Sequence, residues 1–212
     1  MIKIHPTAIV ETQDIGQRTS IWAMVHVMKN VVIGSDCNIG DHCFLESGCR
    51  VGDRVTIKNM VLLWDGVTIQ DDVFIGPRVT FSNDRYPRSP RMPQAKQRYE
   101  ATENWLERTM VQRGCSIGAG AILCPGIELG AYSMIAAGAV VTAPVSPFSL
   151  VRGVPAKHVT DVCVCGHPLP GDWRCCDCPE CGRSGYDRQQ LLQQANLGLP
   201  SIDFRQPVKQ HG

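Results

Sequence analysis

The chain has 212 residues, enough for one main core and a small appendage. Its formal charge of +1 argues against a nucleic-acid partner held by bulk charge, and its apolar content of 43% excludes a disordered chain. No run of about 18 apolar residues occurs, and the first residues lack the apolar segment of a signal peptide. We therefore expect a cytoplasmic protein without a membrane span.

Aliphatic side chains recur at every sixth residue over most of the chain. The positions are Ile9, Ile15, Ile21, Val27, Ile33, Ile39, Leu45, Val51, Ile57, Leu63, Ile69 and Ile75, then Phe81, and in the same phase Val111, Ile117, Leu123, Leu129, Ile135 and Val141. Residues two places earlier are small or β-branched, and glycine often follows the aliphatic residue, where we expect it to supply the positive φ of a turn. The pattern predicts an all-β parallel coil with three short strands in about 18 residues.

Eleven cysteines are present, five in residues 1–162 and six in residues 163–181. In a chain that is not exported, core thiols, metal ligands or nucleophiles are favoured over disulfides. Four occupy the small inward register of the repeat: Cys37, Cys43, Cys49 and Cys115. We expect these four to be packing residues, whereas Cys124 lies outside that register and has no assigned role.

The repeat resembles the left-handed parallel β-helix of the hexapeptide-repeat acyltransferases. The hand comes from this resemblance, because parallel crossovers are otherwise right-handed almost without exception. The alternative, a right-handed β-solenoid, usually has longer and less regular coils. The resemblance covers about residues 3–160, and we take 1–160 as the transferase domain.

Residues 82–110 interrupt the repeat with a loop rich in proline and charge, and a loop of this length in a regular fold is usually functional. The segment from Phe81 to Ser89 is similar to the loop of hexapeptide-repeat enzymes that N-acetylate 3-amino sugars on nucleotide carriers. Two other parts of the chain resemble the same branch of the family, the amino-sugar enzymes. They are Ser20–Val27, which is similar to the first full coil, and the C-terminal end, formed by Gly138–Val141 together with Val151–Lys157. The resemblance implies a short helix after the last strand.

Members of this family are trimers that bind acetyl-CoA and the sugar between adjacent solenoids. The resemblance therefore implies a homotrimer, with Lys157 and Arg152 positioned after the last strand to meet the CoA phosphates. The alternative for both residues is ordinary surface charge.

In the family, an Asn at the mouth of the insert lies near the sugar amine, and the departing CoA sulfur takes the proton. The matching residue is Asn83, which can accept a hydrogen bond from the amine. Hexapeptide O-acetyltransferases instead use a histidine base, for which His26 and His42 in the solenoid are the candidates. The alternative for both histidines is a turn or surface position.

Four further side chains are candidates for substrate binding. Arg85 and Arg88 suit a nucleotide diphosphate or a sugar carboxylate, which arginine binds with two parallel hydrogen bonds. Asp84 either contacts substrate or caps the loop turn. Glu46 lies two coils before the loop, where it can face the cleft.

The segment 161–187 resembles a zinc ribbon. Cys163 and Cys165, followed by glycine, and Cys178 and Cys181, also followed by glycine, have the spacing of two knuckles that close a tetrahedral S₄ site. Such a zinc would be structural, and iron in a rubredoxin-like site is the alternative. The extra residues Cys175 and Cys176 can replace a ligand, and the segment has no Lys/Arg cluster for nucleic acid. Residues 188–212 are expected to hold the rest of a short helix, Asp187–Leu197, and a flexible tail.

Taken together, these features favour an N-acetyltransferase that moves acetyl from acetyl-CoA to the 3-amino group of a nucleotide-linked sugar, in surface polysaccharide biosynthesis of the O-antigen type. The alternatives are an O-acetyltransferase of a sugar or serine and a non-catalytic trimeric scaffold. A solenoid carbonic anhydrase needs closely spaced zinc histidines, and no two solenoid histidines lie closer than sixteen residues.

Overall fold

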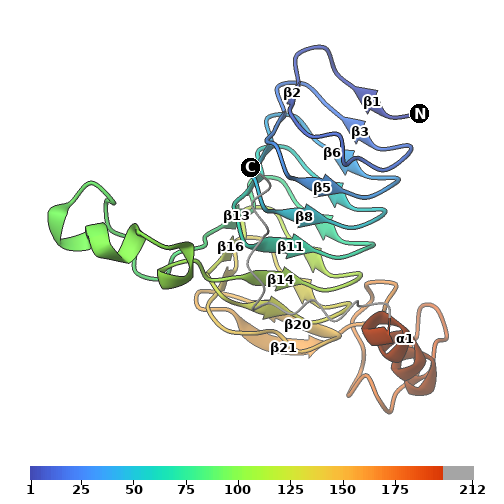
Figure 1. Ribbon diagram of the computed structural model, residues 1–212. Helices are drawn as coiled ribbons and strands as arrows, with labels where there is room; N and C mark the ends of the chain where they lie inside the picture. Colours follow the sequence, from blue (N-terminus) through green and yellow to red (C-terminus); the bar gives the residue numbers. More distant parts are fainter. Residues whose placement is uncertain (198–212) are drawn as a thin grey trace.

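The computed structural model describes residues 1–197 and shows a triangular β-solenoid built from three parallel sheets (Figure 1). Sheet A contains β1 (Lys3–Ile4), β3 (Ser20–Ile21), β6 (Asn38–Ile39), β9 (Thr56–Ile57), β12 (Phe74–Ile75), β15 (Ser116–Ile117), β18 (Met134–Ile135), β20 (Ser149–Arg152) and β21 (Lys157–Asp161). Sheet B contains β2 (Ile9–Val10), β4 (His26–Val27), β7 (Phe44–Leu45), β10 (Leu62–Leu63), β13 (Thr80–Phe81), β16 (Ile122–Leu123) and β19 (Val140–Val141). Sheet C contains β5 (Val32–Ile33), β8 (Arg50–Val51), β11 (Val67–Ile69), β14 (Thr109–Val111) and β17 (Glu128–Leu129).

Each coil pairs with the next through residues of the same register, as in Ile39 with Ile57 and Ile57 with Ile75. The aliphatic positions from Ile21 to Phe81 and from Val111 to Val141 are buried and form one continuous core. A narrow triangular core of this kind takes aliphatic side chains and has little room for rings. The predicted all-β, left-handed parallel β-helix is confirmed.

Positive φ occurs three residues after the aliphatic positions from Ile15 to Ile75 and from Val111 to Ile135, not directly after them. The non-glycine residues in this conformation between the first and last coils are Arg18, Met24, Asn30, Asp36, His42, Arg54, Met60, Asp72, Arg78 and Tyr132. The glycines that directly follow the aliphatic residues, such as Gly34 and Gly118, are not in this region of φ. The predicted role of these glycines as positive-φ turn residues is therefore wrong.

Those glycines are needed because consecutive coils approach one another closely at the corners. A Cβ added to Gly34 would lie 2.5 Å from the backbone of Gly52, and one added to Gly118 would lie 2.4 Å from the nitrogen of Ala137. Both distances are shorter than any ordinary contact, and backbone cannot move aside without opening the stack.

We expect Gly118→Ala to lower the free energy of unfolding by about 3 kcal/mol or more, because the added methyl group meets the backbone of the next coil. Gly120→Ala is the matched control, since Gly120 has a φ of +67° and open space around its Cβ position, and only the backbone conformation is then strained. That control is expected to cost about 1 kcal/mol. Chemical denaturation of both variants measures the difference, and equal losses would contradict the close-approach explanation.

The first coil is one residue shorter than the others. Val10 pairs with the buried Val27, while Ile9 pairs with His26 on the outer face and is 58% exposed. The prediction that Ile9 points inward is therefore wrong. A slip of one residue moves every side chain of a strand to the opposite face, because the side-chain period of a strand is two.

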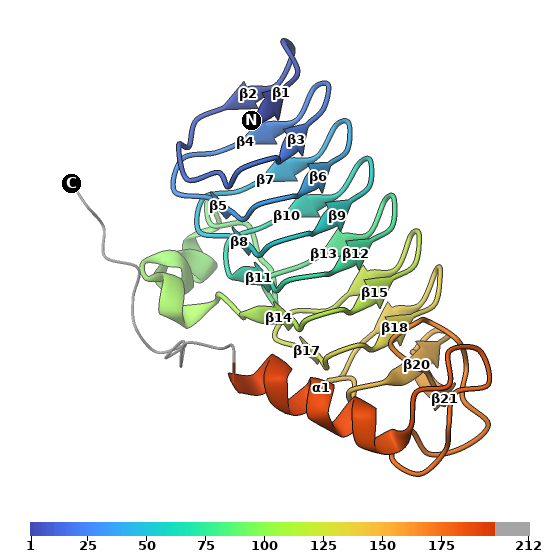
Figure 2. The ribbon, with the colours of Figure 1, turned by 90° about the vertical axis from the view of Figure 1, so that its right-hand side faces the viewer.

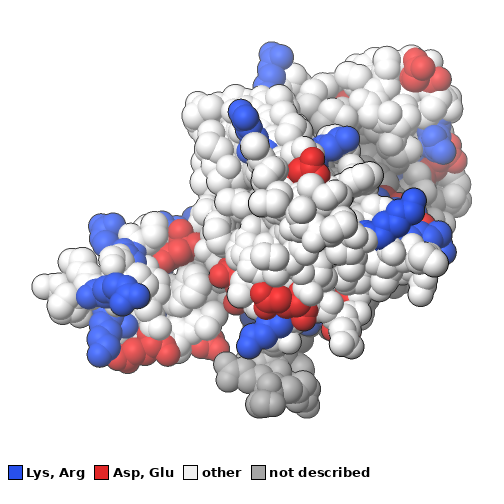
Figure 3. Space-filling model, turned by 90° about the horizontal axis from the view of Figure 1, so that it is seen from above, with Lys and Arg blue, Asp and Glu red and all other residues white. Residues whose placement is uncertain are grey.

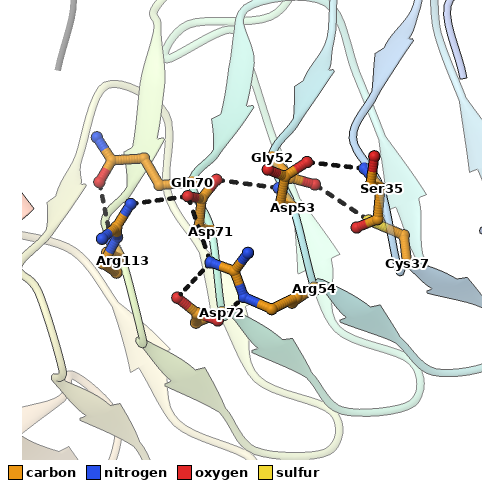
Figure 4. A network of polar contacts seen from close by, with 9 residues as sticks. All are labelled: Ser35, Cys37, Gly52, Asp53, Arg54, Gln70, Asp71, Asp72 and Arg113. Atoms are coloured by element: carbon orange, nitrogen blue, oxygen red, sulfur yellow. Dashed lines mark hydrogen bonds and ion pairs between the residues drawn. The ribbon is translucent and has the colours of Figure 1, made fainter. Parts of the chain in front are cut away.

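A ladder of polar side chains connects the turns between sheets C and A (Figure 4). The Asp53 carboxylate accepts the backbone N–H of Ser35 at 2.7 Å, and the Asp71 carboxylate accepts that of Asp53 at 2.9 Å. Asp71 also forms ion pairs with Arg113 at 2.7 Å and Arg54 at 3.6 Å. These side chains satisfy turn amides that the parallel stack leaves without a backbone partner.

The solenoid ends in a β-hairpin. After β19 the chain forms β20 and β21, which pair antiparallel, so the short helix expected after the last strand is not there. The C-terminal helix is α1 (Gly185–Leu197), which begins two residues before the predicted start because Ser184 and Asp187 form a capping box. The predicted flexible tail at 198–212 lies outside the described residues.

Figure 2 shows α1 and the loops before it at the end of the solenoid, beside β20 and β21. Within residues 1–197, no helix combines the length and apolar character needed to cross a membrane.

Candidate functional site

The insert projects from the solenoid as a separate arm, drawn in green in Figure 1. It leaves at the end of β13 and returns at β14, and it contains two 3-10 helices, η1 (Pro93–Tyr99) and η2 (Thr102–Asn104). Its neck is a short antiparallel contact in which Asp84 bridges Leu106 and the backbone N–H of Glu107 donates to the carbonyl of Asn83 at 2.9 Å. The neck fixes Asn83 and Asp84 against the solenoid.

Asp84 holds the arm to its neck. Its carboxylate accepts hydrogen bonds from Arg98 at 2.5 Å, from the Tyr99 hydroxyl at 2.7 Å and from the Tyr86 amide at 2.9 Å. Burial raises the pKa of the Asp84 carboxyl, but these donors outweigh burial and hold the pKa below its ordinary value. Of the two roles expected for Asp84, the structure displays the loop-capping one.

Asn83 lies at the corner between sheets B and C, in line with two acidic residues of the preceding coils. Its side-chain amide donates to the backbone oxygen of Asp65 at 3.2 Å, and the backbone N–H of Asp65 donates to the Glu46 carboxylate at 2.8 Å. The carbonyl oxygen of the Asn83 side chain forms no hydrogen bond within residues 1–197. This oxygen is the acceptor that an incoming amine needs.

Asp65 is the member of this corner that the sequence analysis missed. Its carboxyl is partly buried, and burial raises its pKa against the opposing effects of the Gly66 amide and the charge of Arg108. The signal that finds it is the coil period, because Asp65 precedes Asn83 by one coil of eighteen residues.

The two arginines of the loop differ in their surroundings. Arg85 donates to the backbone oxygen of Pro125 at 2.9 Å and pairs with Glu107 at 3.4 Å, so it braces the neck against the next coil. Arg88 is exposed, and among residues 1–197 its guanidinium donates only to the backbone oxygen of Pro87, at 3.0 Å. Arg88 is therefore the arginine with more donors left for a ligand.

The two candidate histidines lie away from Asn83 within one protomer. His26 sits on the outer face of sheet B, bonded to Glu11 at 2.7 Å and in edge contact with Phe44. It lies three coils from β13, which is about 14 Å along the solenoid axis. His42 is an exposed turn residue with a φ of 58° at the corner between sheets A and B.

The β20–β21 hairpin brings the two candidate CoA-binding residues together. Arg152 ends β20 and Lys157 begins β21, and they are paired across the hairpin with both side chains exposed. The tip between them bonds to β19, where Val140 donates to Gly153 at 3.0 Å and accepts from Ala156 at 2.8 Å. This basic pair thus lies at the corner between sheets A and B, whereas Asn83 lies at the corner between sheets B and C. Along the solenoid axis, the pair is two coils further towards the C-terminal end than Asn83.

Comparison with known proteins decides the family. A family model described as bacterial transferase hexapeptide (six repeats) matches residues 14–47 and 108–143. The chain is 48% identical over 166 residues to the dTDP-3-amino-3,6-dideoxy-α-D-galactopyranose 3-N-acetyltransferase of Aneurinibacillus thermoaerophilus, covering 78% of this chain and 81% of the relative. The chain belongs to the hexapeptide-repeat acetyltransferases.

Two solved structures are similar to parts of this acetyltransferase. A hexapeptide-repeat acetyltransferase of Vibrio cholerae, complexed with acetyl coenzyme A, is 26% identical with a TM-score of 0.46, over 70% of each chain. A variant of the GDP-perosamine N-acetyl transferase of Caulobacter crescentus, in complex with CoA and GDP-perosamine, is 20% identical with a TM-score of 0.47. That match covers 76% of this chain and 57% of the Caulobacter chain.

The solenoid cysteines of the acetyltransferase are divided as predicted. Cys37, Cys43, Cys49 and Cys115 are buried, and burial raises the pKa of Cys43 to about 11 and that of Cys49 and Cys115 to about 12. Thiols in this state are poor nucleophiles, so their role in packing is confirmed. Cys124 is half-buried at the start of the corner that follows β16.

The acetyltransferase also carries a cluster of four thiols after the solenoid. The sulfur atoms of Cys163, Cys165, Cys178 and Cys181 all lie within 4.8 Å of one another, and Cys175 and Cys176 lie outside the group. The knuckle glycines Gly166 and Gly182 have φ of +87° and +70°, as their turns require. The amide and guanidinium of Arg183 lower the pKa of Cys181, whereas desolvation among the neighbouring thiols raises the pKa of Cys165.

Proposed function

We propose that this acetyltransferase moves acetyl from acetyl-CoA to the 3-amino group of a dTDP-linked 3-amino-3,6-dideoxyhexose. The observation that carries the proposal is the 48% identity to a relative named for that reaction, over most of both chains. The arm with its Asn83 corner, which the sequence resemblance assigns to amino-sugar enzymes, supports the same substrate class.

In the proposed reaction, the neutral sugar amine attacks the thioester carbonyl. A C–N bond forms, the C–S bond breaks, and the proton lost by the nitrogen goes to the departing CoA sulfur. A sugar amine has a pKa of about 8, so it demands little of a base at neutral pH. The free carbonyl oxygen of Asn83 accepts an N–H of the amine and aims the nitrogen lone pair at the carbonyl carbon.

Charged residues at two places would hold the phosphates. On the arm, Arg88 and the remaining donors of Arg85 would bind the nucleotide diphosphate, and Arg152 and Lys157 at the hairpin would bind the CoA phosphates. Figure 3 shows basic side chains on the projecting arm, whose 82–110 segment holds six basic and four acidic residues. Outward residues of sheet B, among them Ile122 and Val140, lie between the two places and offer an apolar path for pantetheine.

The working assembly that we propose is a homotrimer in the cytoplasm, acting in the synthesis of a surface polysaccharide of the O-antigen type. A cleft between adjacent solenoids would let the arm of one protomer cover the site of its neighbour. Within one protomer, Asn83 lies far from both His26 and His42. In such a cleft, His26 or His42 of a second protomer can approach Asn83 of the first. The Glu46 carboxylate, which accepts a hydrogen bond from the backbone N–H of Asp65, would line the same cleft.

The experiment is acetyl transfer from acetyl-CoA to a panel of acceptors: dTDP-3-amino-3,6-dideoxyhexoses, UDP-linked 3-amino-glucuronates, serine and sugars with hydroxyls only. We expect loss of the free amine and release of CoA with the dTDP amino sugar. Transfer to hydroxyl acceptors alone would make the protein an O-acetyltransferase. No transfer, together with no thermal shift on adding CoA, would make it a scaffold.

We also propose that Cys163, Cys165, Cys178 and Cys181 bind one structural zinc ion. Four thiols within 4.8 Å of one another match the donor set and size of a tetrahedral zinc site, and the set leaves no open position for catalysis. A metal would organise a segment that is too short to form a core of its own.

A further inference from the structure

Arg188, in the first turn of α1, is a fully buried cation. Its exposed fraction is 0%, and its guanidinium donates to the backbone oxygens of Trp173 at 2.8 Å, Arg183 at 2.8 Å and Cys176. These three carbonyls belong to the loop that carries the second pair of metal-site cysteines and to the turn beside it. Arg188 thus joins α1 to the cysteine segment.

The charge of Arg188 has no carboxylate partner within residues 1–197. Its neighbour Asp187 is used as the helix cap, where its carboxylate accepts from the amide and hydroxyl of Ser184. Burying an ammonium or guanidinium ion without an opposite charge costs several kcal/mol, and carbonyl dipoles offset only part of that cost. A buried arginine in this setting implies a nearby anion.

The cysteine cluster lies against this guanidinium. The guanidinium of Arg188 lies 3.7 Å from the sulfur of Cys163, one of the four clustered thiols. A divalent metal bound by four thiolates carries a net charge of −2, whereas four protonated thiols carry none.

We propose that Arg188 is the buried counter-cation of a dianionic tetrathiolate metal centre, and that α1 docks stably only when that centre is loaded. The inference rests on the proposed metal site and is independent of the acyl acceptor. Arg188 acts as a positioning residue, because it touches the Cys163 ligand and not the metal.

Docking of α1 also reaches the last coil of the solenoid. Trp173, whose carbonyl Arg188 holds, packs its ring on Phe148 at a centroid distance of 4.6 Å, and Phe148 stacks on Tyr132 at 5.2 Å. Phe148, Trp173 and Leu169 form one buried apolar cluster with the cysteine segment, against which Tyr132 of the last coil packs. The loaded metal centre would therefore stabilise the C-terminal cap of the solenoid.

The test compares Arg188→Met with Arg174→Met in the full-length protein. Arg174 is an exposed arginine of the same segment that pairs with Asp172 at 3.3 Å, lies over the Trp173 ring at 4.6 Å and makes no contact with the clustered thiols within residues 1–197, and it is the matched control. We expect Arg188→Met to weaken zinc binding about 10- to 100-fold in a chelator competition, as loss of an outer-shell partner does elsewhere, and Arg174→Met to leave it unchanged. With cobalt(II) as the probe, the sulfur-to-metal absorption band of Arg188→Met is expected to shift.

Thermal melts with and without metal distinguish charge pairing from simple packing. Arg188→Met is expected to destabilise the zinc-loaded protein and to leave the metal-free protein unchanged or more stable, because the buried charge has no partner there. Arg188→Lys retains the charge and is expected to recover part of the zinc affinity, which keeps the test valid if the methionine variant folds poorly.

Two results would overturn the proposal: zinc affinity of Arg188→Met equal to that of Arg174→Met, or an equal loss of stability with and without metal. If wild-type protein binds neither zinc nor cobalt, the metal site itself is wrong. Acetyl transfer to amino sugars is measured separately, so its failure leaves this inference standing.

Discussion

Replacing Asn83 with alanine is expected to lower kcat/KM for the amino-sugar acceptor about a hundredfold, which corresponds to about 2.7 kcal/mol of transition-state stabilisation. The reason is geometric. The Asn83 side chain is anchored through its amide to Asp65, and its carbonyl oxygen is the free acceptor at the mouth of the arm. Removing it leaves the amine without an orienting partner, and misorientation at a reacting atom is costly even when binding persists.

The measurement is steady-state kinetics of CoA release with the dTDP amino sugar, together with a thermal melt of each variant. Asn104→Ala is the control, because Asn104 is exposed in η2 of the same arm. We expect the control to retain wild-type kinetics and both variants to melt near the wild-type temperature. Unchanged turnover in Asn83→Ala would remove this residue from the reaction.

Replacing Cys178 with serine is expected to abolish metal binding and to unfold the segment from Cys163 to the end of α1. Cys178 is a buried member of the cluster, and a structural metal site contributes its binding free energy directly to folding, at about 10 kcal/mol or more for small zinc modules. The solenoid has its own continuous core, so its fold is expected to survive.

Metal content by mass spectrometry and limited proteolysis of the C-terminal segment give the two readouts. Cys175→Ser is the matched control, because Cys175 is exposed and lies outside the cluster. It is expected to retain about one metal ion per chain. Full metal content in Cys178→Ser would show that the cluster is not the binding site, and a content of iron in place of zinc would change the metal but not the ligands.

The sequence predicted the features that depend on the six-residue repeat or on short spacings between residues. A strict period of six places the same chemistry at the same point of every coil, so the inward register, from Ile21 to Val141, follows from counting alone. The same count separates the core thiols from the clustered cysteines of the C-terminal segment. The knuckle spacing of Cys163 with Cys165 and Cys178 with Cys181 is local, and short turns leave few ways to arrange it.

The incorrect predictions concern segments where the six-residue period is broken and turn residues that have two candidate roles. The period alone could not reveal the short first coil, which turns Ile9 outward, nor the hairpin in place of the expected helix. The period also could not show whether a corner glycine is needed for a positive φ or for the close approach of the next coil. From the sequence, both reasons explain Gly118 equally well.

The sequence by itself thus determined the fold, the buried register, the family branch suggested by the arm, and the four cysteines that cluster, because each depends on spacing within one coil or one turn. Only the tertiary structure decided that Asp84 is used to hold the arm and that Arg188 is buried against the thiols. Those contacts depend on how the arm and the C-terminal segment fold back on the solenoid. No repeat relates these segments, so their contacts follow from packing and charge in three dimensions.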